Sequence, residues 1–196
     1  MTVPAAEATR RRLTPRQAAV VEQLVEAAAD EARATGYEGV TVRAVARRAG
    51  VAPATAYTYV ASKDHLLAEV LWRRFEALPP VEEAQDRTTA ERVTAELRVL
   101  GLFVADDPTV AAACTTALLG SGPEVRALRV RFGAALHDRL RAALGGDTGD
   151  VDETALRALD LAYSGAMLWA GMGHIHFEDV PEALADTARR LLGDRS

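Results

Sequence analysis

The chain has little cysteine, lysine or aromatic content, and it has no long apolar run. Its 196 residues include a single cysteine, Cys114, which excludes an internal disulfide framework and a zinc site built from several cysteines. The longest uncharged run, 17 residues from Leu161 to Phe177, is shorter and more polar than a membrane span requires. The N-terminus has no apolar signal region. We therefore expect a cytoplasmic protein with no membrane contact.

The composition is that of a globular protein whose charge is unevenly distributed. Apolar residues make up 49% of the chain and charged residues 26%, which suits a buried core rather than a disordered chain. The net charge of −5 argues against a nucleic-acid binder. However, residues 1–64 carry nine Lys/Arg against seven Asp/Glu, whereas residues 65–196 carry fourteen against twenty-one. This asymmetry indicates a basic head on an acidic body, the alternative being a chance difference between solvated faces.

Helical patterns dominate the whole chain and predict an all-α fold. Helix-favouring residues prevail, and apolar residues recur three and four positions apart. Capping patterns such as Thr14–Gln17, Thr88–Glu91 and Asp150–Glu153 precede the periodic stretches. About nine helices are predicted, at residues 15–35, 42–49, 53–59, 63–78, 88–105, 108–119, 123–144, 152–175 and 181–192. Pro79-Pro80 marks the expected hinge between a small head and a larger bundle.

The passage from Thr41 to Leu67 has the pattern of a helix-turn-helix. Two short helices meet at Ala49-Gly50-Val51, where glycine permits the sharp turn between crossed helices. The positions predicted to form its inner face are Val42, Val45, Ala46, Val51, Ala56 and Val60. The outward positions of the second helix are Pro53, Thr55, Thr58 and Tyr59. Such groups suit base edges and thymine methyls in a major groove. The first helix adds Arg43, Arg47 and Arg48 for phosphates or a guanine.

These residues resemble the tetracycline-repressor (TetR) family of transcriptional regulators. The resemblance covers about residues 15–70 and includes the passage Thr35-Gly36-Tyr37-Glu38-Gly39-Val40-Thr41-Val42 and the run Ser62-Lys63-Asp64-His65-Leu66-Leu67. It implies that Thr41 and Lys63 contact phosphate and that Tyr57 contacts the DNA backbone. The residues it places at or near bases are Arg43, Pro53, Thr55, Thr58 and Tyr59. Two departures are Ala56, where the family usually has leucine, and Ala61, where proline or a polar residue is common.

The resemblance also implies how the chain is divided and what it does. Residues 13–62 are expected to form a helix-turn-helix DNA-binding domain, and residues 63–196 a ligand-sensing and dimerisation domain connected by helix 63–78. We expect a repressor that binds a palindromic double-stranded operator as a homodimer and is released by a small, mostly apolar effector. No cofactor is implied. The alternatives are a helical-cavity enzyme, against which the absence of a phosphate loop or a catalytic triad argues, and a protein-interaction bundle.

The homodimer is expected to form through helices 152–175 and 181–192. Apolar groups such as Leu161 and Leu168 surround most of the later turns of the first helix, more than a monomer surface tolerates. The second helix is expected to contribute Leu184, Ala188 and Leu191 to the partner. Residues that could line a ligand cavity, with ordinary bundle core as the alternative for each, are Phe103, Leu119, Phe132, Tyr163, Met167 and Trp169.

Four smaller features each have two interpretations. Lys63, the only lysine, lies at a helix start that suits phosphate, although a plain surface lysine is the alternative. Arg10–Arg12 form either a minor-groove arm or a solvated terminus. His174 and His176 point apart on a helix, so they can share a metal ion only if the helix has ended, and no metal is expected. Cys114 lies in an apolar run and is expected to be a buried, unreactive thiol.

Overall fold

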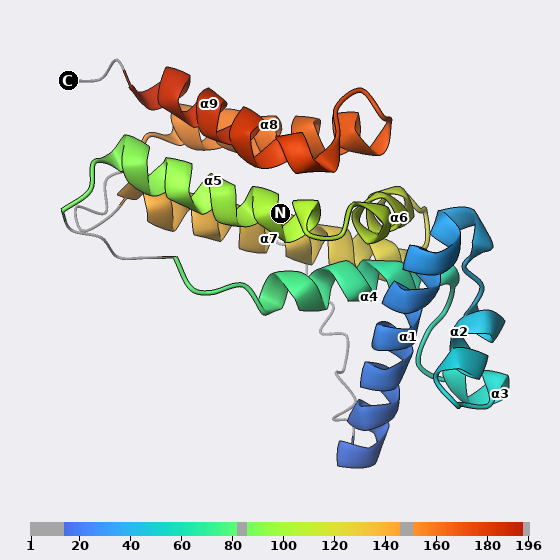
Figure 1. Ribbon diagram of the computed structural model, residues 1–196. Coiled ribbons are helices and arrows are strands. Elements are labelled where there is room, and N and C mark those ends of the chain that lie inside the picture. Colours follow the sequence, from blue (N-terminus) through green and yellow to red (C-terminus); the bar gives the residue numbers. More distant parts are fainter. Residues whose placement is uncertain (1–13, 82–85, 146–150, 194–196) are drawn as a thin grey trace.

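A computed structural model describes residues 14–81, 86–145 and 151–193. Within these ranges the only regular secondary structure is helix. The α-helices are α1 (Pro15–Gly39), α2 (Val42–Arg48), α3 (Pro53–Ala56), α4 (Lys63–Glu76), α5 (Thr89–Ala105), α6 (Pro108–Leu118), α7 (Pro123–Gly145), α8 (Glu153–Gly171) and α9 (Val180–Leu192). A short 3₁₀ turn, Phe177–Asp179, precedes α9. The all-α prediction with about nine helices is confirmed for these residues (Figure 1).

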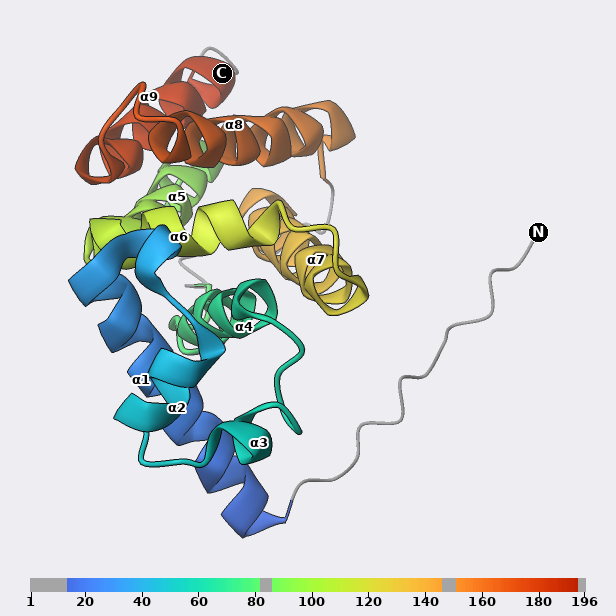
Figure 2. The ribbon, with the colours of Figure 1, turned by 90° about the vertical axis from the view of Figure 1, so that its right-hand side faces the viewer.

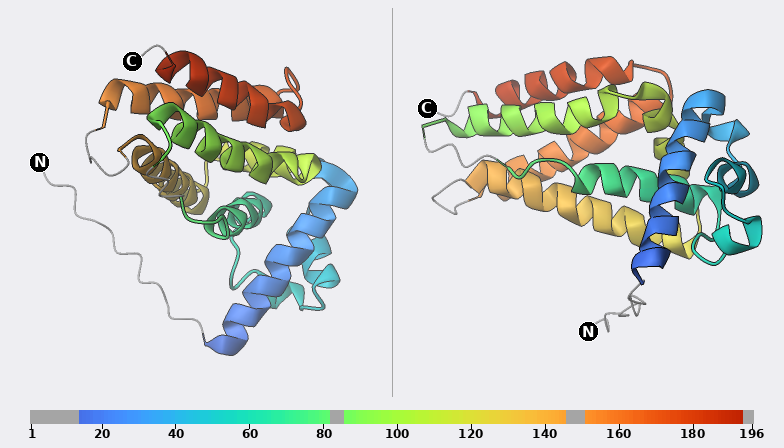
Figure 3. Two further views of the ribbon diagram at one scale, coloured as in Figure 1. Left: turned by 60° about the vertical axis from the view of Figure 1, so that its left-hand side comes forward. Right: turned by 60° about the horizontal axis from the view of Figure 1, so that its bottom comes forward.

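The helices form a small head and a layered body. Helices α1, α2 and α3 form the head, which lies at one end of the molecule in every view (Figures 1 and 3). Figure 2 shows α8 and α9 as an outer layer over α5, α6 and α7, with α4 beneath them. Helix α1 packs against α4 and α6 as well as against α2, so the head rests on α4 and α6 of the body.

Local capping chemistry sets most helix starts. Thr14 and Thr88 each accept a hydrogen bond from the backbone N–H three residues later, and the side chains of Gln17 and Glu91 each accept one from the backbone N–H of that cap residue. These two predicted capping boxes are therefore confirmed. The start of α8 differs, because Asp152 caps it by accepting from two backbone N–H groups. The predicted cap at residue 150 lies outside the described residues.

Two predicted helices are too long. Helix α8 ends at Gly171 instead of residue 175, because Gly173 adopts a left-handed φ of 77° and the N–H of His174 donates to the carbonyl of Trp169 at 2.9 Å. This is the hydrogen-bond pattern of a glycine-terminated helix. Helix α3 ends at Ala56 instead of residue 59. Residues 57–59 form a turn, in which the N–H of Tyr59 donates to the carbonyl of Ala56 at 2.9 Å.

The buried core differs in composition between the head and the body. The head is closed by small side chains, and Ala28, Ala32 and Val45 are completely buried. The body instead contains an aromatic cluster in which the ring of Phe75 lies 4.7 Å from that of Phe132, centroid to centroid. Small side chains let the short head helices approach closely, whereas the aromatic rings fill the wider space between the body helices.

Two further predictions concern the body. Cys114 is fully buried, as predicted, and burial raises the pKa of its thiol to about 12. No helix among the described residues is both long and apolar enough to cross a membrane.

Candidate functional site

The turn between α2 and α3 is built as the sequence predicts. Gly50 has a φ of 67°, a left-handed conformation that glycine adopts without steric cost. The N–H of Val51 donates to the carbonyl of Ala46 at 2.9 Å, which closes the end of α2. At the start of α2, the hydroxyl of Thr41 accepts from the N–H of Ala44 at 3.1 Å. These bonds fix the crossing of the two helices and therefore the direction of α3.

The two faces of this unit separate apolar from polar groups. All six predicted inner residues are buried or half-buried, including Ala56 with no exposed surface and Val60 at 3%. The predicted contact residues that are exposed are Thr41, Arg43, Pro53, Thr55, Tyr57 and Thr58. The hydroxyl of Thr58 donates to the carbonyl of Thr55 at 2.6 Å, so the turn after α3 is held in place. Tyr59 is half-buried and packs against the core.

Lys63 makes contacts inside the head. Its ammonium donates to the carbonyl of Tyr37 at 3.2 Å and lies 3.9 Å from the centroid of the Tyr37 ring. The Tyr37 hydroxyl in turn donates to Asp64 at 2.6 Å, and this hydrogen bond raises the pKa of Tyr37 to about 12. An ammonium has three donors, so further donors remain for a phosphate. The phosphate contact of Lys63 stays a prediction.

The three arginines of α2 divide between two environments. Arg48 pairs with Glu31 of α1 at 2.7 Å, which ties α2 to α1. Arg43 and Arg47 are exposed, and within the described ranges neither forms an ion pair. They are therefore available to DNA phosphates, whereas Arg48 is engaged in the head. Residues 10–12, the predicted arginine arm, lie outside the described residues.

The six residues predicted to line a ligand cavity are scattered. Phe103 and Tyr163 are buried in the core, and Phe132 and Met167 are half-buried against it. Leu119 and Trp169 are exposed at 63% and 58%. Phe103 and Phe132 both pack on the ring of Phe75, and the ligand contacts of all six residues stay a prediction.

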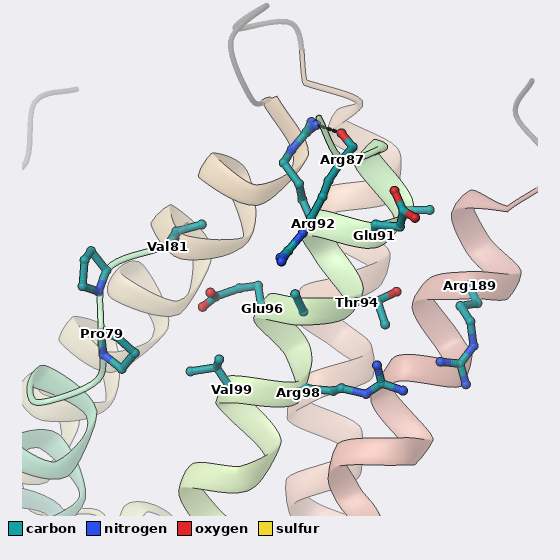
Figure 4. A pocket seen from close by; sticks show the side chains of 13 residues that line it. Pro79, Val81, Arg87, Glu91, Arg92, Thr94, Glu96, Arg98, Val99 and Arg189 are labelled. Atoms are coloured by element: carbon teal, nitrogen blue, oxygen red, sulfur yellow. Dashed lines mark hydrogen bonds between the residues drawn. The ribbon is translucent and has the colours of Figure 1, made fainter. Parts of the chain in front are cut away.

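A cavity of about 710 Å³ lies elsewhere, over the outward face of α5. Its described lining residues are Pro79, Pro80, Val81, Arg87, Ala90, Glu91, Arg92, Thr94, Ala95, Glu96, Arg98, Val99 and Arg189. In Figure 4, Pro79 and Val81 flank α5 on one side and Arg189 of α9 on the other. The volume is within the range of small-molecule sites. Sequence reasoning missed this cavity because its walls come from segments far apart in the chain.

Buried polar contacts hold one wall of this cavity. Glu96, only 4% exposed, accepts from Arg139 at 2.5 and 3.2 Å, and Arg139 also donates to the carbonyl of Pro79 at 2.8 Å. Arg92 donates to the carbonyl of Ala143 in α7 and, as the dashed line in Figure 4 marks, to that of Arg87. The segment after α4 and the start of α5 are thus anchored to α7, and the cavity is preformed.

The two histidines after α8 are exposed, and the helix has ended before them. Among the residues that the structure describes, no three potential metal ligands lie close enough together to hold an ion.

Comparisons with known proteins agree with the helix-turn-helix. Residues 24–70 match the family model described as bacterial regulatory proteins, tetR family. An uncharacterized HTH-type transcriptional regulator of Mycobacterium tuberculosis is 43% identical over 185 residues, which cover 93% of this chain and 84% of the relative. The HTH-type transcriptional repressor KstR of Rhodococcus jostii is 34% identical over 165 residues, covering 82% and 77%.

Among solved structures, a TetR transcriptional regulator from Rhodococcus sp. RHA1 superimposes with a TM-score of 0.68 at 22% identity. The match covers 93% of this chain and all of the other. The similarity in fold therefore extends through the body, beyond the 24–70 match to the family model. Together with the sequence relatives, these findings show that the chain belongs to the TetR family of DNA-binding transcriptional regulators.

Proposed function

We propose that this regulator is a ligand-responsive repressor that binds a palindromic operator as a homodimer and is released by a small effector. The observation that carries the proposal is the exposed polar surface of α3 and the turn after it, backed by buried Ala56 and Val60. On this surface, exposed Thr55 and Thr58 are proposed to reach base edges, and exposed Tyr57 is proposed to contact the DNA backbone. Residues 13–62 act as the DNA-binding domain and residues 63–196 as the sensor and dimerisation domain.

The dimer is proposed to form on the outer face of α8. This face carries an apolar stripe in which Leu161 is 67% exposed, Leu168 40% and Met172 61%, at helical spacings of seven and four residues. Neighbouring Trp169 adds a large exposed ring. Such a stripe is unfavourable in water, and a second copy related by a twofold axis would cover it.

Helix α9 has a smaller part in this dimer than the sequence suggested. Leu184 and Ala188 are 2% and 0% exposed in the single chain, where α9 packs against α5 and α8. The prediction that these two residues face a partner is therefore wrong. The apolar face of α9 packs within its own bundle. The exposed face of α9 carries polar residues such as Asp186 and Arg190.

A twofold dimer accounts for operator recognition. One head offers few base contacts, whereas two heads can read half-sites about 34–36 Å apart, or a multiple of that distance, on one side of the duplex. An effector bound in the body would favour a head spacing that no longer matches the groove, and DNA affinity would fall.

The junction between head and body offers a route for this coupling. Asp107, the N-cap of α6, accepts from Arg33 of α1 at 2.6 Å and from Arg74 of α4 at 3.1 Å. A displacement of the start of α6 therefore changes the position of α1 and α4 together.

The test is selection of an operator from DNA flanking the coding region, followed by binding at several salt concentrations. We expect one palindromic site bound by two chains, with specific affinity about 10³-fold or more above that for random DNA. A protein-interaction bundle would bind neither the selected operator nor random DNA, even at low salt. An enzyme would show turnover and no sequence preference. Either result would contradict the proposal.

A further inference from the structure

The cavity over α5 combines an apolar floor with an end at which two arginines meet. Ala95 and Val99 lie on the outward face of α5, one turn apart, and Pro79, Pro80 and Val81 form an apolar wall beside them. On the other side of α5, Arg98 and Arg189 extend toward one another from α5 and α9 (Figure 4). An elongated apolar surface therefore runs up to two guanidinium groups.

The four arginines of this cavity have unequal roles. Arg92 joins α5 to α7, because it donates to backbone carbonyls at the end of α7. Arg98 and Arg189 both donate to Glu182, at 3.3 and 2.8 Å, so two cations share that carboxylate at the cavity rim. Each does so through Nη2 only, and Nη2 of Arg189 also donates to Asp186. Since a guanidinium has five N–H donors, both groups retain donors for another anion.

A buried hydroxyl lies beside this pair. Thr94 lines the cavity one helical turn before Arg98, is 7% exposed, and has no hydrogen-bond partner for its Oγ in the described structure. Figure 4 shows its side chain directed toward α9, the side on which Arg98 and Arg189 meet. A buried polar group without a partner is costly, and an acceptor brought by a ligand would remove that cost.

We propose that this cavity binds an amphipathic anion, whose apolar chain lies along Ala95, Val99 and the Pro79–Val81 wall and whose anionic group binds Arg98 and Arg189. Charge-assisted bonds from two guanidinium groups favour an anionic end over a neutral one. The inference deepens the proposed function by naming the chemical class of the effector: the sequence suggested a mostly apolar molecule, and the cavity adds an acidic group to it.

The probe is dodecanoate, titrated into the full chain in a calorimeter, with 1-dodecanol and acetate as matched compounds lacking the charge or the chain. We expect one dodecanoate per chain, and binding at least about tenfold weaker for either control compound. Equal binding of 1-dodecanol would overturn the proposal, because the arginines would then contribute nothing. Equal binding of acetate would overturn it as well, since the pair would be only a site for small anions.

Variants locate the site. Arg98→Gln with Arg189→Gln should weaken dodecanoate binding about tenfold or more, whereas Arg190→Gln, an exposed arginine of α9 outside the cavity, should not. Val99→Trp should abolish binding by filling the floor. Thermal unfolding of each variant should stay close to that of the parent, because the exposed ion pairs of Arg98 and Arg189 contribute little to stability.

The exposed apolar face of α8 is the competing site for an alkyl chain. Loss of dodecanoate binding in Leu168→Gln, with full binding in the arginine and Val99→Trp variants, would overturn the proposal. Operator binding is measured separately. Dodecanoate that binds the cavity without changing operator affinity would leave this site in place and refute its role as the effector site. Operator binding and dimerisation without any dodecanoate binding would refute the site and leave the DNA-binding function intact.

Discussion

The head and the body use their side chains in opposite ways. In the head, small residues such as Ala28 and Ala46 form the core, and the groups proposed to act face outward on α3 and the following turn. In the body, leucines and a cluster of aromatic rings form the core, and the groups proposed to bind an effector come from α5, α9 and the segment after α4. A recognition surface can be encoded by one short stretch of sequence, whereas a cavity requires distant segments to meet.

The junction between the two regions is polar at both ends of α6. At its start, Asp107 binds arginines of α1 and α4. After its end, Gly120 lies close to Asp64 at the start of α4. A Cβ at this position would be only 3.0 Å from a carboxylate oxygen of Asp64. The contrast between head and body therefore predicts four kinds of effect: on assembly, on base preference, on the junction and on phosphate binding.

The largest effect is expected from the dimer face of the body. Leu168→Glu would bury a carboxylate without a partner in the proposed interface, so the dimer should dissociate. Specific operator affinity should then fall by roughly 100-fold or more, because single heads lose the paired half-sites. Sedimentation and operator titration measure the two effects. The matched control is Leu102→Glu, a leucine 52% exposed on α5, which should leave both unchanged. A dimeric Leu168→Glu protein would contradict the assignment of α8.

The next effect belongs to the head alone. Thr55→Ala removes an exposed hydroxyl from α3 without touching the buried face, so the fold should persist. Operator selection should then show relaxed preference at one or two symmetric base pairs, by about 1–3 kcal/mol. A uniform loss across all sequences would instead assign Thr55 to the DNA backbone.

The junction should give an intermediate, pH-dependent effect. Partial burial alone would raise the pKa of Asp107, but hydrogen bonds from Arg33 and Arg74 outweigh it and hold the pKa below its usual value. The stabilisation is therefore complete above about pH 4, the range of an unfolded aspartate, and is lost as the pH falls through the lower folded pKa.

Asp107→Asn should accordingly lower the free energy of unfolding by about 1–2 kcal/mol at pH 7. The difference from the parent protein should shrink below about pH 4. Denaturant unfolding at several pH values measures it. Asp106→Asn, at the exposed neighbouring position, serves as the control. An equal loss for both variants would show that the contacts of Asp107 with the two arginines contribute nothing particular.

The smallest effect is expected at Lys63. If its ammonium binds phosphate, Lys63→Ala should weaken binding similarly for all DNA sequences and reduce the slope of log K against log salt by about one per chain. Lys63→Arg should restore the slope by restoring the charge. An unchanged slope together with lower thermal stability would show that the contacts of Lys63 with Tyr37 are its whole role.

The sequence by itself determined the helices, several of their caps and the exposed residues of α3, because these depend on neighbours within a few residues. Thr14, Gly50 and the alternation around Ala56 illustrate this, and each was placed correctly. Helix ends were harder to predict from the sequence. The left-handed turn at Gly173 and the turn after Ala56 differ only slightly in free energy from a continued helix.

Only the tertiary structure decided what the apolar residues of the body do. The helical spacing of Leu184 and Leu168 looks alike in sequence, yet one packs within its own bundle and the other faces outward on α8. The cavity over α5 likewise depends on Arg139 holding Pro79 against α7 and on α9 bringing Arg189 to Arg98. Periodicity fixes which face of a helix is apolar, but the partner of that face is set by contacts between residues far apart in the chain.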